Sequence, residues 1–350
     1  MEINSFDFGA ELAEAVDHVK VWPTVGEMTA LLDGDLLPYM IGFGIREDMW
    51  LRAQNRVESG KFASLSETPE FEEVKQRICM TINFWVTGAG CDSAVIYMTD
   101  SPKNFRLRMA IQRQYKGTRK TDKPPFFYES RQFMLEHLGA INSEEEEADD
   151  LITIHLYEHQ LNTLRESGIK LGSPQHRELA RFVVCSKDKD LAISCGWHYS
   201  VAERKLHWVE ELGELMPQWG ETSKGKPNIK KLRGTGMKFF YSQMLQGDGV
   251  DNYTGIPRMK LMDIYHLLDN CTSERELYEA TLSAYKAWMI KQNGNPEMYI
   301  HNFRGGGRFM KAHEVMHEQA RLAHMQRFKG EIWRSDKVPV LWGADESLWN

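Results

Sequence analysis

The sequence lacks paired cysteines, long hydrophobic runs and a basic leader. Its five cysteines are odd in number and scattered, with no CxxC pair, so we expect thiols in a reducing compartment. No apolar run approaches the roughly 20 residues that a membrane-spanning helix needs. The first residues, MEINSFDFGAELAEAV, are acidic where a signal peptide carries basic side chains. These absences predict a cytoplasmic protein with no membrane partner.

The composition is that of a folded protein whose charges are unevenly distributed. The chain has 350 residues, 42% of them apolar, which is enough for a substantial core. A net charge of −7 argues mildly against a nucleic-acid partner. However, residues 101–131 contain nine Lys or Arg against two acidic residues, and residues 222–247 contain six against none. This distribution predicts positive surfaces beside a negative site.

Three apolar runs lead into an aspartate within two residues. They are LL before Asp33, AVIYM before Asp100 and FVVC before Asp188. Continuous apolar runs separated by helices are typical of a parallel sheet covered on both faces. Sites in such sheets form at the carboxyl ends of the strands, so we expect the three aspartates along one rim. A single strand-ending aspartate is usually a turn residue, but three of them favour a shared site.

The stretch NSEEEEADDLI, residues 142–152, places six acidic side chains in seven positions just before an apolar segment. Ser143 and Glu146 have the spacing of a capping box, which predicts a helix starting near residue 144. Glu147 and Asp150 would then share a face, with Asp149 beside them. Taken alone, the cluster is explained by capping and by compensation of the helix dipole.

Ten carboxylates in five clusters account for the net negative charge of the chain, because without them the net charge would be +3 rather than −7. Carboxylates gathered on one rim repel unless cations are present. Oxygen ligands of this kind suit Mg²⁺ or Mn²⁺, and two such ions can activate a water and neutralise a phosphate. The clusters are DGD with Asp33 and Asp35, TD with Asp100, EADD with Glu147, Asp149 and Asp150, KDKD with Asp188 and Asp190, and GDGVD with Asp248 and Asp251.

The order DGD, TDS, FR, YKGTR, EADD, SKDKDL and GDGVDNYTGIP over residues 31–260 resembles the flap endonuclease/5′ nuclease family, and most nearly the 5′→3′ exonucleases of short-tailed bacteriophages. The resemblance would extend to the C-terminal VPVLW. It implies an α/β fold of the PIN-like/5′ nuclease kind, with a central, mostly parallel sheet flanked by helices. It further implies a helical arch over the site and a C-terminal helical region containing a helix–three-turn–helix element that grips duplex DNA.

The resemblance also implies roles for single residues. Asp33, Asp100, Glu147 and Asp149 would serve a first metal ion. Asp150, Asp188, Asp190, Asp248 and Asp251 would serve a second ion or its water shell. In YKGTR, Lys116 would lie over the scissile phosphate, Arg119 would hold a phosphate and Tyr115 would stack on a base. That peptide alone favours a solvated basic loop, although an ammonium suits a transition-state oxygen and an aromatic ring suits unpaired bases.

Basic residues of the two positive segments are the predicted DNA contacts, through phosphates rather than bases. They are Arg106, Arg113, Lys120, Lys123, Lys230, Lys231, Arg233, Lys238, Arg258 and Lys260. Two features depart from the family pattern. The duplex-gripping turn reads GIPRMK at residues 255–260, without its second glycine, so a monovalent-ion site there is in doubt. The family's LxYR after the first aspartate is replaced by Pro38-Tyr39-Met40.

The expected organisation is a nuclease core at residues 1–202, with the arch at 101–142, followed by a mainly helical duplex-binding region at 203–350. Residues 1–30 are expected to be helical, LAISCGWHYSV a strand or hairpin, and residues 203–290 largely helical. The expected activity is 5′→3′ exonuclease or flap endonuclease, in phage DNA replication, RNase H-like primer removal or recombination. The expected partner is DNA with a 5′ end or an RNA–DNA hybrid, bound by a monomer in the cytoplasm of the bacterial host.

Two other functions compete with this interpretation. HEVMH at residues 313–317 fits HExxH, in which His313 and His317 bind zinc and Glu314 acts as the base of a peptidase. The extended motif fails, because its glycine is absent and His324 comes one position late. A polar surface helix is the simpler interpretation of this segment. A non-catalytic DNA-binding protein on a nuclease fold is the third possibility, and the intact carboxylate set argues against it.

Overall fold

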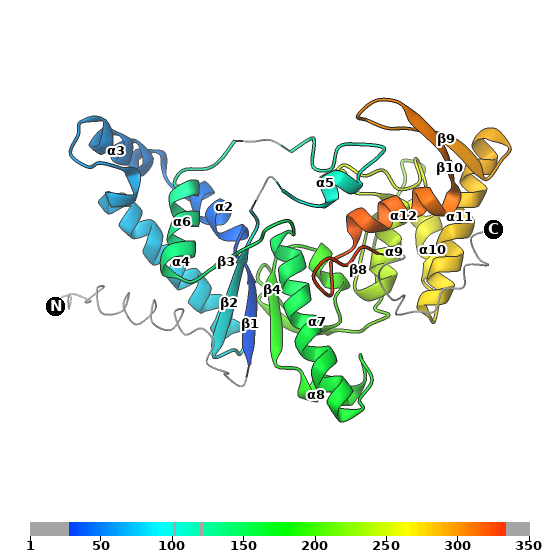
Figure 1. Ribbon diagram of the computed structural model, residues 1–350, viewed down its shortest axis with the longest axis horizontal. Coiled ribbons are helices and arrows are strands. Elements are labelled where there is room, and N and C mark those ends of the chain that lie inside the picture. The colour runs from blue at the N-terminus through cyan, green and yellow to red at the C-terminus, as the bar shows by residue number, and fades with distance from the viewer. Residues whose placement is uncertain (1–27, 101–102, 120–121, 334–350) are drawn as a thin grey trace.

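The computed structural model describes residues 28–100, 103–119 and 122–333. Its centre is a six-stranded sheet in the order β3-β2-β1-β4-β5-β6. Neighbouring strands are parallel except β6, which is antiparallel to β5. The predicted central, mostly parallel sheet is therefore confirmed (Figure 1). The strands are β1 (Thr29–Asp33), β2 (Ser93–Met98), β3 (Ile141–Asn142), β4 (Phe182–Ser186), β5 (Gly196–Ser200) and β6 (Lys205–Val209).

Helices cover both faces of the sheet, which explains the unbroken apolar runs of its strands. All six residues of β2 are buried, and the residues of β1 alternate between two cores. Leu32 packs in the core beneath α4, whereas Leu31 packs against α7. Helices α2 (Leu36–Phe43), α3 (Glu47–Glu58), α4 (Pro69–Gly88) and α6 (Phe127–His137) form one side, and α7 (Ala148–Ser167) and α8 (Pro174–Leu179) lie on the other (Figure 1).

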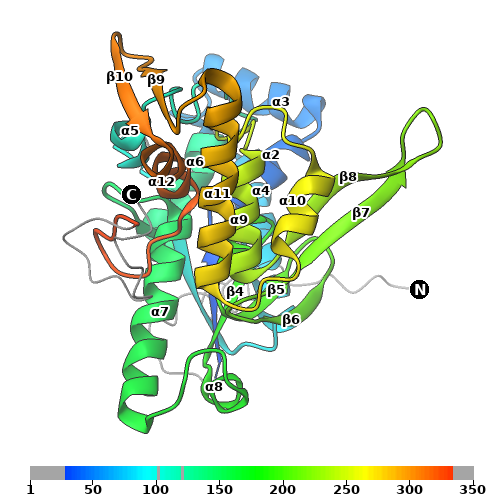
Figure 2. The same ribbon diagram turned by 90° about the vertical axis from the view of Figure 1, so that its right-hand side faces the viewer.

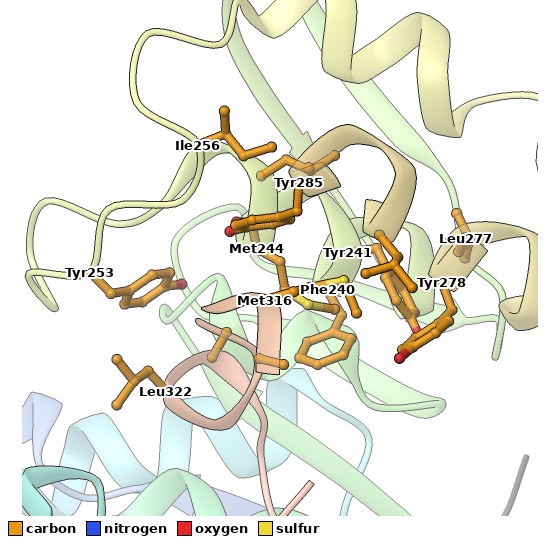
Figure 3. Close-up of a cluster of buried hydrophobic side chains, with 14 of the residues drawn as sticks. Phe240, Tyr241, Met244, Tyr253, Ile256, Leu277, Tyr278, Tyr285, Met316 and Leu322 are labelled. Carbon is orange, nitrogen blue, oxygen red and sulfur yellow. The ribbon is translucent and has the colours of Figure 1, made fainter. Parts of the chain in front are cut away.

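A second core is built by the C-terminal part of the chain. Its helices are α9 (Gly236–Gln246), α10 (Leu261–Leu268), α11 (Glu274–Asn293) and α12 (Ala312–Ala323). Aromatic and methionine side chains from these helices interlock around Phe240, Met244 and Met316 (Figure 3). Two hairpins extend from this core, β7 (Leu215–Glu221) with β8 (Pro227–Gly234) and β9 (Glu297–His301) with β10 (Gly307–Lys311) (Figure 2).

Several sequence predictions can now be compared with the structure. The strands before Asp33, Asp100 and Asp188 are confirmed, and LAISCGWHYSV contributes β5 of a hairpin with β6. The expected helices over residues 203–290 are wrong for 205–234, which form β6, β7 and β8. In β8 the adjacent lysines Lys230 and Lys231 are both exposed, so the sequence does not show the apolar–polar alternation by which a strand is recognised. Residues 1–27 and the VPVLW ending lie outside the described residues.

A helical arch was expected over residues 101–142, and the described residues of that range, 103–119 and 122–142, are helical only in α5 (Arg106–Met109) and α6. Between these helices, the described part of the chain crosses above the carboxyl ends of the strands as turns and extended backbone (Figure 1). Within the described residues, no helix has the length and apolarity needed to cross a membrane.

The predicted capping box at Ser143 is wrong, because α7 begins at Ala148 rather than near residue 144. The Ser143 hydroxyl instead accepts a hydrogen bond from the Asp100 amide at 2.9 Å. The start of α7 is capped by its own aspartate, since the Glu147 amide donates to Asp150 Oδ2 at 3.0 Å. The Ala148 amide donates to the Thr99 hydroxyl at 2.9 Å, which fixes the start of α7 to the end of β2.

Candidate active site

The carboxyl ends of β1 and β4 bring Asp33 and Asp188 together. The Ser186 hydroxyl donates to Asp33 Oδ2 at 3.1 Å and accepts from the Asp188 amide at 2.9 Å. Because β1 and β4 are parallel neighbours, their last residues meet at one edge of the sheet. Burial, together with the charges of Asp35 and Asp188, raises the pKa of Asp33 to about 8. Burial is the largest cause of this raised pKa, and the two neighbouring carboxylates add to it.

The start of α7 adds Asp149 and Glu147 to this rim. Burial raises the pKa of Asp149 well above its usual range, and the charges of Asp33, Asp188 and Glu147 raise it further. Its Oδ1 atom is buried and accepts no hydrogen bond from the described residues. Carboxylates from β1, α7 and the loop after β4 therefore lie close enough to repel one another, with one oxygen still unsatisfied.

A second group of carboxylates surrounds Lys189. Its ammonium contacts Asp190 Oδ1 at 2.9 Å and Asp248 Oδ2 at 2.6 Å, which joins the loop after β4 to the loop after α9. Gln243, from α9, donates its amide to the same Asp190 oxygen. Burial and the charge of Asp188 raise the pKa of Asp190 to about 6 even with Lys189 beside it. The two groups of carboxylates are therefore electrostatically coupled through Asp188.

The arch segment places three of its residues against the same carboxylates. The Tyr115 hydroxyl donates to Glu147 Oε2 at 3.0 Å and to Asp251 Oδ2 at 2.8 Å. The Lys116 ammonium binds Glu147 Oε1, and Arg119 binds Asp251 Oδ1 at 2.6 Å. Lys116 adopts a left-handed backbone conformation, φ 54°, and its amide donates to the Asp251 carbonyl at 3.0 Å. These contacts turn the Lys116 side chain onto the rim.

Lys116 and Glu147 keep each other charged despite their burial. Desolvation pulls the pKa of Lys116 down, but the charges of Glu147 and Asp251 outweigh it and leave the pKa raised. Desolvation likewise pushes the pKa of Glu147 up, and Lys116 and Arg106 reverse that shift. The site therefore presents an ammonium among carboxylates, a combination that suits a negatively charged substrate only if further cations are added.

The chemistry of the donor atoms, though not their present spacing, suits hard divalent cations. All of the donor atoms are carboxylate oxygens, the atoms that Mg²⁺ and Mn²⁺ prefer, and their mutual repulsion and the unsatisfied Asp149 oxygen both favour added positive charge. In the described part of the chain, no three His, Cys, Asp or Glu side chains converge closely enough to enclose an ion. Three cations instead supply compensating charge: Lys116 pairs with Glu147, Arg119 with Asp251 and Lys189 with Asp248.

Asp150 was a predicted metal ligand, but its carboxylate is fully occupied by protein donors. Arg106 binds it through both terminal nitrogens at 2.5 and 2.7 Å, and the amides of Glu147 and Gln326 donate to it at 3.0 Å each. Arg106 was a predicted DNA contact, and that prediction is wrong because its side chain is fully buried. The buried pair joins α5, α7 and the chain after α12 in a structural role.

We expect Arg106→Met to lower the free energy of unfolding by roughly 3–5 kcal/mol, because it leaves a buried carboxylate without its cation. Arg108→Met is the matched control, since Arg108 pairs with Glu145 at the surface and should cost under about 1 kcal/mol. Urea unfolding followed by circular dichroism measures both changes. Adding Asp150→Leu to Arg106→Met should recover part of the loss, and failure to recover any would contradict the charge-based explanation.

The other predicted residues are placed as follows. Tyr115 is only 2% exposed, so the prediction that it stacks on a base is wrong, and it orients Glu147 and Asp251 instead. Asp100 lies half-buried after β2, where Ser143 holds its amide. Asp35, which was not among the predicted ligands, lies beside Asp33 and pairs with Arg131 at 2.7 Å.

Most of the predicted DNA contacts are at the surface. Exposed are Arg113, Lys123, Lys230, Lys231, Arg233, Arg258 and Lys260. Lys238 is half-buried and donates to the Asp269 carbonyl, and Lys123 lies over the Phe127 ring, 4.5 Å from its centroid. Lys120 lies outside the described residues. The β7–β8 hairpin and the turn before α10 therefore present cations to solvent, as charge patterning predicted.

The GIPRMK turn lies between α9 and α10, where a helix–three-turn–helix element was expected. The Thr254 and Gly255 amides donate to Gln319 Oε1 of α12, at 3.0 and 2.9 Å. These two amides are therefore engaged by a side chain and do not face a phosphate. Arg258 takes a left-handed conformation, φ 66°, with its side chain exposed.

Neither interpretation of HEVMH describes α12, whose residues are mostly buried rather than on a polar surface and whose Glu314 and His317 have partners other than a metal ion. Glu314 caps the start of α12, accepting from the Lys311 amide at 2.8 Å, and pairs with Arg308 at 2.6 Å. His317 is buried, with Nε2 at 3.1 Å from the Tyr278 hydroxyl. His324 lies beyond the end of α12 and contacts Glu331 at 3.1 Å. The His313 and His317 rings lie 5.6 Å apart, but Glu314 and His324 are held by other partners, and no group of His, Cys, Asp or Glu in the described part of the chain encloses an ion.

Sequence reasoning missed two residues that organise the site. Ser186 links Asp33 to Asp188, and a serine two residues before an aspartate is a familiar turn signal that could have revealed it. Gln243 holds Asp190 from within the apolar helix α9. An isolated amide among Phe, Tyr, Met and Leu was its only sequence signal.

No family model and no curated protein matches the sequence. Two solved structures of the bacteriophage T5 D15 protein are similar to it. The first, co-crystallised with metal ions, is 12% identical over 84% of this chain and 88% of that chain, with a TM-score of 0.43. The second, a D15 flap endonuclease variant in a pseudo-enzyme–product complex with DNA and metal ions, is 11% identical over 84% of this chain and 98% of that chain, with a TM-score of 0.34.

Proposed function

We propose that this chain is a divalent-metal-dependent 5′ nuclease that hydrolyses DNA phosphodiesters at or near a 5′ end. One observation supports it above all. Carboxylates from β1, α7 and the loops after β4 and α9 gather around Lys116 and Lys189 at the carboxyl ends of the strands. Negative charge this dense, partly buried and facing a basic arch, suits a cation-assisted reaction on a polyanion.

The proposed ligands for two Mg²⁺ or Mn²⁺ ions are carboxylates of this rim. When bound, the ions supply the nucleophilic water and the positive charge that phosphodiester hydrolysis needs. Asp150 is left out of the set because its carboxylate is satisfied by Arg106. The proposed set is Asp33, Asp100, Glu147, Asp149, Asp188, Asp190, Asp248 and Asp251.

Lys116 and Arg119 are the proposed phosphate contacts of the reaction. The arch holds both against the carboxylates through Glu147 and Asp251, so a strand lying between arch and rim would meet an ammonium and a guanidinium. An ammonium is a compact charge that can stabilise an oxygen of the reacting phosphate, and a guanidinium can hold a neighbouring phosphate by two hydrogen bonds. The buried Tyr115 hydroxyl donates to Glu147 and Asp251 and so positions both carboxylates.

The proposed substrates are duplex or flap DNA with a 5′ end, or an RNA–DNA hybrid, bound by a monomer. The exposed cations of the β7–β8 hairpin and of the turn before α10 would hold its phosphates without selecting a sequence. The proposed setting is DNA replication, primer removal or recombination in the cytoplasm of a phage-infected bacterium.

Product analysis on a panel of 5′-labelled duplex, nicked, flap and hybrid substrates tests this proposal. With Mg²⁺ or Mn²⁺ we expect release of 5′-terminal products, and with EDTA none. The sizes of the products distinguish exonuclease from flap endonuclease. Binding without release on every substrate, at all concentrations of either ion, would instead support a DNA-binding protein that retains a nuclease fold.

Binding to duplex DNA in EDTA should weaken steeply as salt rises, because phosphate contacts release counterions. Replacing Lys230, Lys231 and Arg233 with glutamine should lower the affinity and flatten the slope of log affinity against log salt by roughly two to three units. Fluorescence anisotropy measures both quantities. Replacing Lys75, which lies over the Phe71 ring on α4, is the matched control and should change neither. An unchanged slope in the triple variant would remove the hairpin from the DNA surface.

A further inference from the structure

The outer face of the β9–β10 hairpin carries an exposed pair of aromatic side chains. Tyr299 and Phe309 stand directly opposite each other on the two strands. Their ring centroids are 5.6 Å apart at an interplanar angle of 77°. The two residues are 42% and 63% exposed. The hairpin projects from the C-terminal core, with its outer end well away from the sheet (Figures 1 and 2).

The hairpin does not need these rings to attach to the molecule. Side chains alternate between the two faces of a strand, and the inner face holds Ile300 and Met310, both buried in the C-terminal core. The outer positions could therefore be polar, as on most solvated sheet faces. A cross-strand aromatic pair adds little to a hairpin that is already anchored in this way. Large apolar rings concentrated on such a face indicate a binding surface.

The charge around the rings favours a polyanion. Residues 295–312 contain Arg304, Arg308 and Lys311 against the single acidic residue Glu297, in a chain whose net charge is −7. A third exposed ring, Phe303, lies 4.2 Å from the guanidinium carbon of Arg304. Aromatic rings interleaved with cations are the combination that holds single-stranded nucleic acid, because every base offers a face for stacking and every nucleotide a phosphate.

The hairpin is tied to the chain segment that leads to Lys116. The Phe303 amide donates to the Ile111 carbonyl at 3.0 Å, and Arg304 donates to the Ala110 carbonyl at 2.6 Å. Ile111 lies five residues before Lys116, so their Cα atoms are at most about 18 Å apart even in a fully extended chain. The turn of the hairpin, where Phe303 and Arg304 lie, is thus within a few nucleotides' length of the proposed reaction site.

The glycines of the turn shape this face. Gly305 and Gly306 have φ of +114° and +73°, and a side chain at either would project into open space. Gly307 is paired with His301, and a Cβ there would come within 2.9 Å of the Tyr299 ring. Gly305 and Gly306 therefore leave their part of the turn without side chains, and Gly307 leaves room for Tyr299 on the outer face.

We propose that the outer face of the β9–β10 hairpin is a stacking platform for unpaired bases of a single-stranded nucleic acid. The proposal rests on the proposed nuclease function and specifies where the unpaired strand of its substrate is held. Tyr299 and Phe309 stack on bases, Phe303 extends the platform toward the arch, and the exposed Lys311 meets a phosphate.

Anisotropy titrations with a fluorescein-labelled oligothymidylate, in EDTA so that no cleavage intervenes, test the platform. We expect the Tyr299→Ala/Phe309→Ala variant to bind it at least about tenfold more weakly than the wild type. The variant carrying Tyr299→Phe and Phe309→Tyr should bind like the wild type, because both rings remain. Phe84→Ala is the matched control, since Phe84 is an exposed ring on α4 with Arg204 over it, and α4 lies across the central sheet from the hairpin (Figure 1).

A blunt duplex without unpaired bases should bind all four proteins equally. Unchanged oligothymidylate affinity in the double alanine variant, with its thermal midpoint retained, would overturn the platform. So would an equal loss for the blunt duplex, or self-association of the wild type that the double variant abolishes. These outcomes are separate from the nuclease proposal, which fails only if labelled substrates are not cut with Mg²⁺ or Mn²⁺.

Discussion

Asp33→Asn is expected to make the metal-free protein more stable and to remove most of its thermal response to Mg²⁺. Burial and the charges of Asp35 and Asp188 raise the pKa of Asp33 to about 8. At and above neutral pH, a metal-free protein therefore either keeps a proton on Asp33 or holds a buried charge among like charges. An asparagine avoids both. The Ser186 hydroxyl, which donates to Asp33, can accept from the new amide instead.

The sign of the pH dependence follows from this raised pKa. Between about pH 4 and pH 8 the folded protein binds a proton at Asp33 that the unfolded chain has released. The metal-free protein should therefore lose stability as pH rises through this window. Each pKa unit corresponds to about 1.4 kcal/mol, so the loss is on the order of 5 kcal/mol at most. Mg²⁺ binding competes with the proton and should raise the thermal midpoint more at pH 8.5 than at pH 6.

Differential scanning fluorimetry at the two pH values, in EDTA and in Mg²⁺, measures all of these effects. Asp92→Asn is the matched control, because Asp92 precedes β2 and lies at the opposite end of the sheet from the rim. It should leave both the stability and the Mg²⁺ response unchanged. An Asp33→Asn protein that is less stable than the wild type in EDTA, or a wild-type Mg²⁺ response that is equal at both pH values, would contradict the crowded carboxylate rim.

The part of the site built on the sheet could be predicted from the sequence. Continuous apolar runs separated by helices are typical of parallel strands whose sheet is covered on both faces. Neighbouring parallel strands end at the same edge of the sheet. That reasoning alone placed Asp33, Asp100 and Asp188 near one rim. The structure joins the first and last of these through Ser186.

Contacts between distant segments could not be predicted in the same way. Tyr115 meets Asp251 across 136 residues of chain, and Arg106 meets Asp150 and the carbonyl of Leu322. Nothing local distinguishes Arg106, fully buried, from Arg108, which is 57% exposed in its side chain two residues later. An arginine of a basic segment can be buried only where the fold places a carboxylate against it. Tertiary packing, and not the local sequence, therefore decides which arginine is buried.

The hairpins were missed for a different reason. In β8, Lys230 and Lys231 are both exposed beside a register shift at Gln218 and Trp219 of β7. This irregularity breaks the strict alternation by which strands are recognised. The lysine-rich composition then resembled a solvated helix. In β9–β10, the glycine run at 305–307 indicates a loop, but the strands beside it are only five residues each, which is too short for a clear strand pattern.

Asp188→Asn should lower the rate of DNA cleavage by a factor of about 10³ or more while leaving the affinity for DNA in EDTA within about twofold of the wild type. The side chain faces the other carboxylates of the rim and raises the pKa of Asp33, Asp149 and Asp190. Its loss therefore weakens a cation site rather than a phosphate contact. Single-turnover cleavage of a 5′-labelled flap, together with anisotropy, separates the two quantities.

Lys116→Met should give the complementary pattern. Its ammonium is the charge that the arch presents to the rim, so we expect cleavage to fall roughly 10²-fold or more. Mg²⁺ binding should not weaken and should tighten, because Glu147 is released from its internal cation. Isothermal titration of Mg²⁺ into the two variants distinguishes a ligand from a competing cation. Weaker Mg²⁺ binding in Lys116→Met would contradict the role of Lys116 as a cation that competes with Mg²⁺. Unchanged Mg²⁺ binding in Asp188→Asn would contradict the role of Asp188 as a Mg²⁺ ligand. Both side chains lie at the same rim, so loss of cleavage alone cannot tell their roles apart. A fall in Mg²⁺ affinity identifies a residue that holds the cation, and a rise in Mg²⁺ affinity identifies one that substitutes for it.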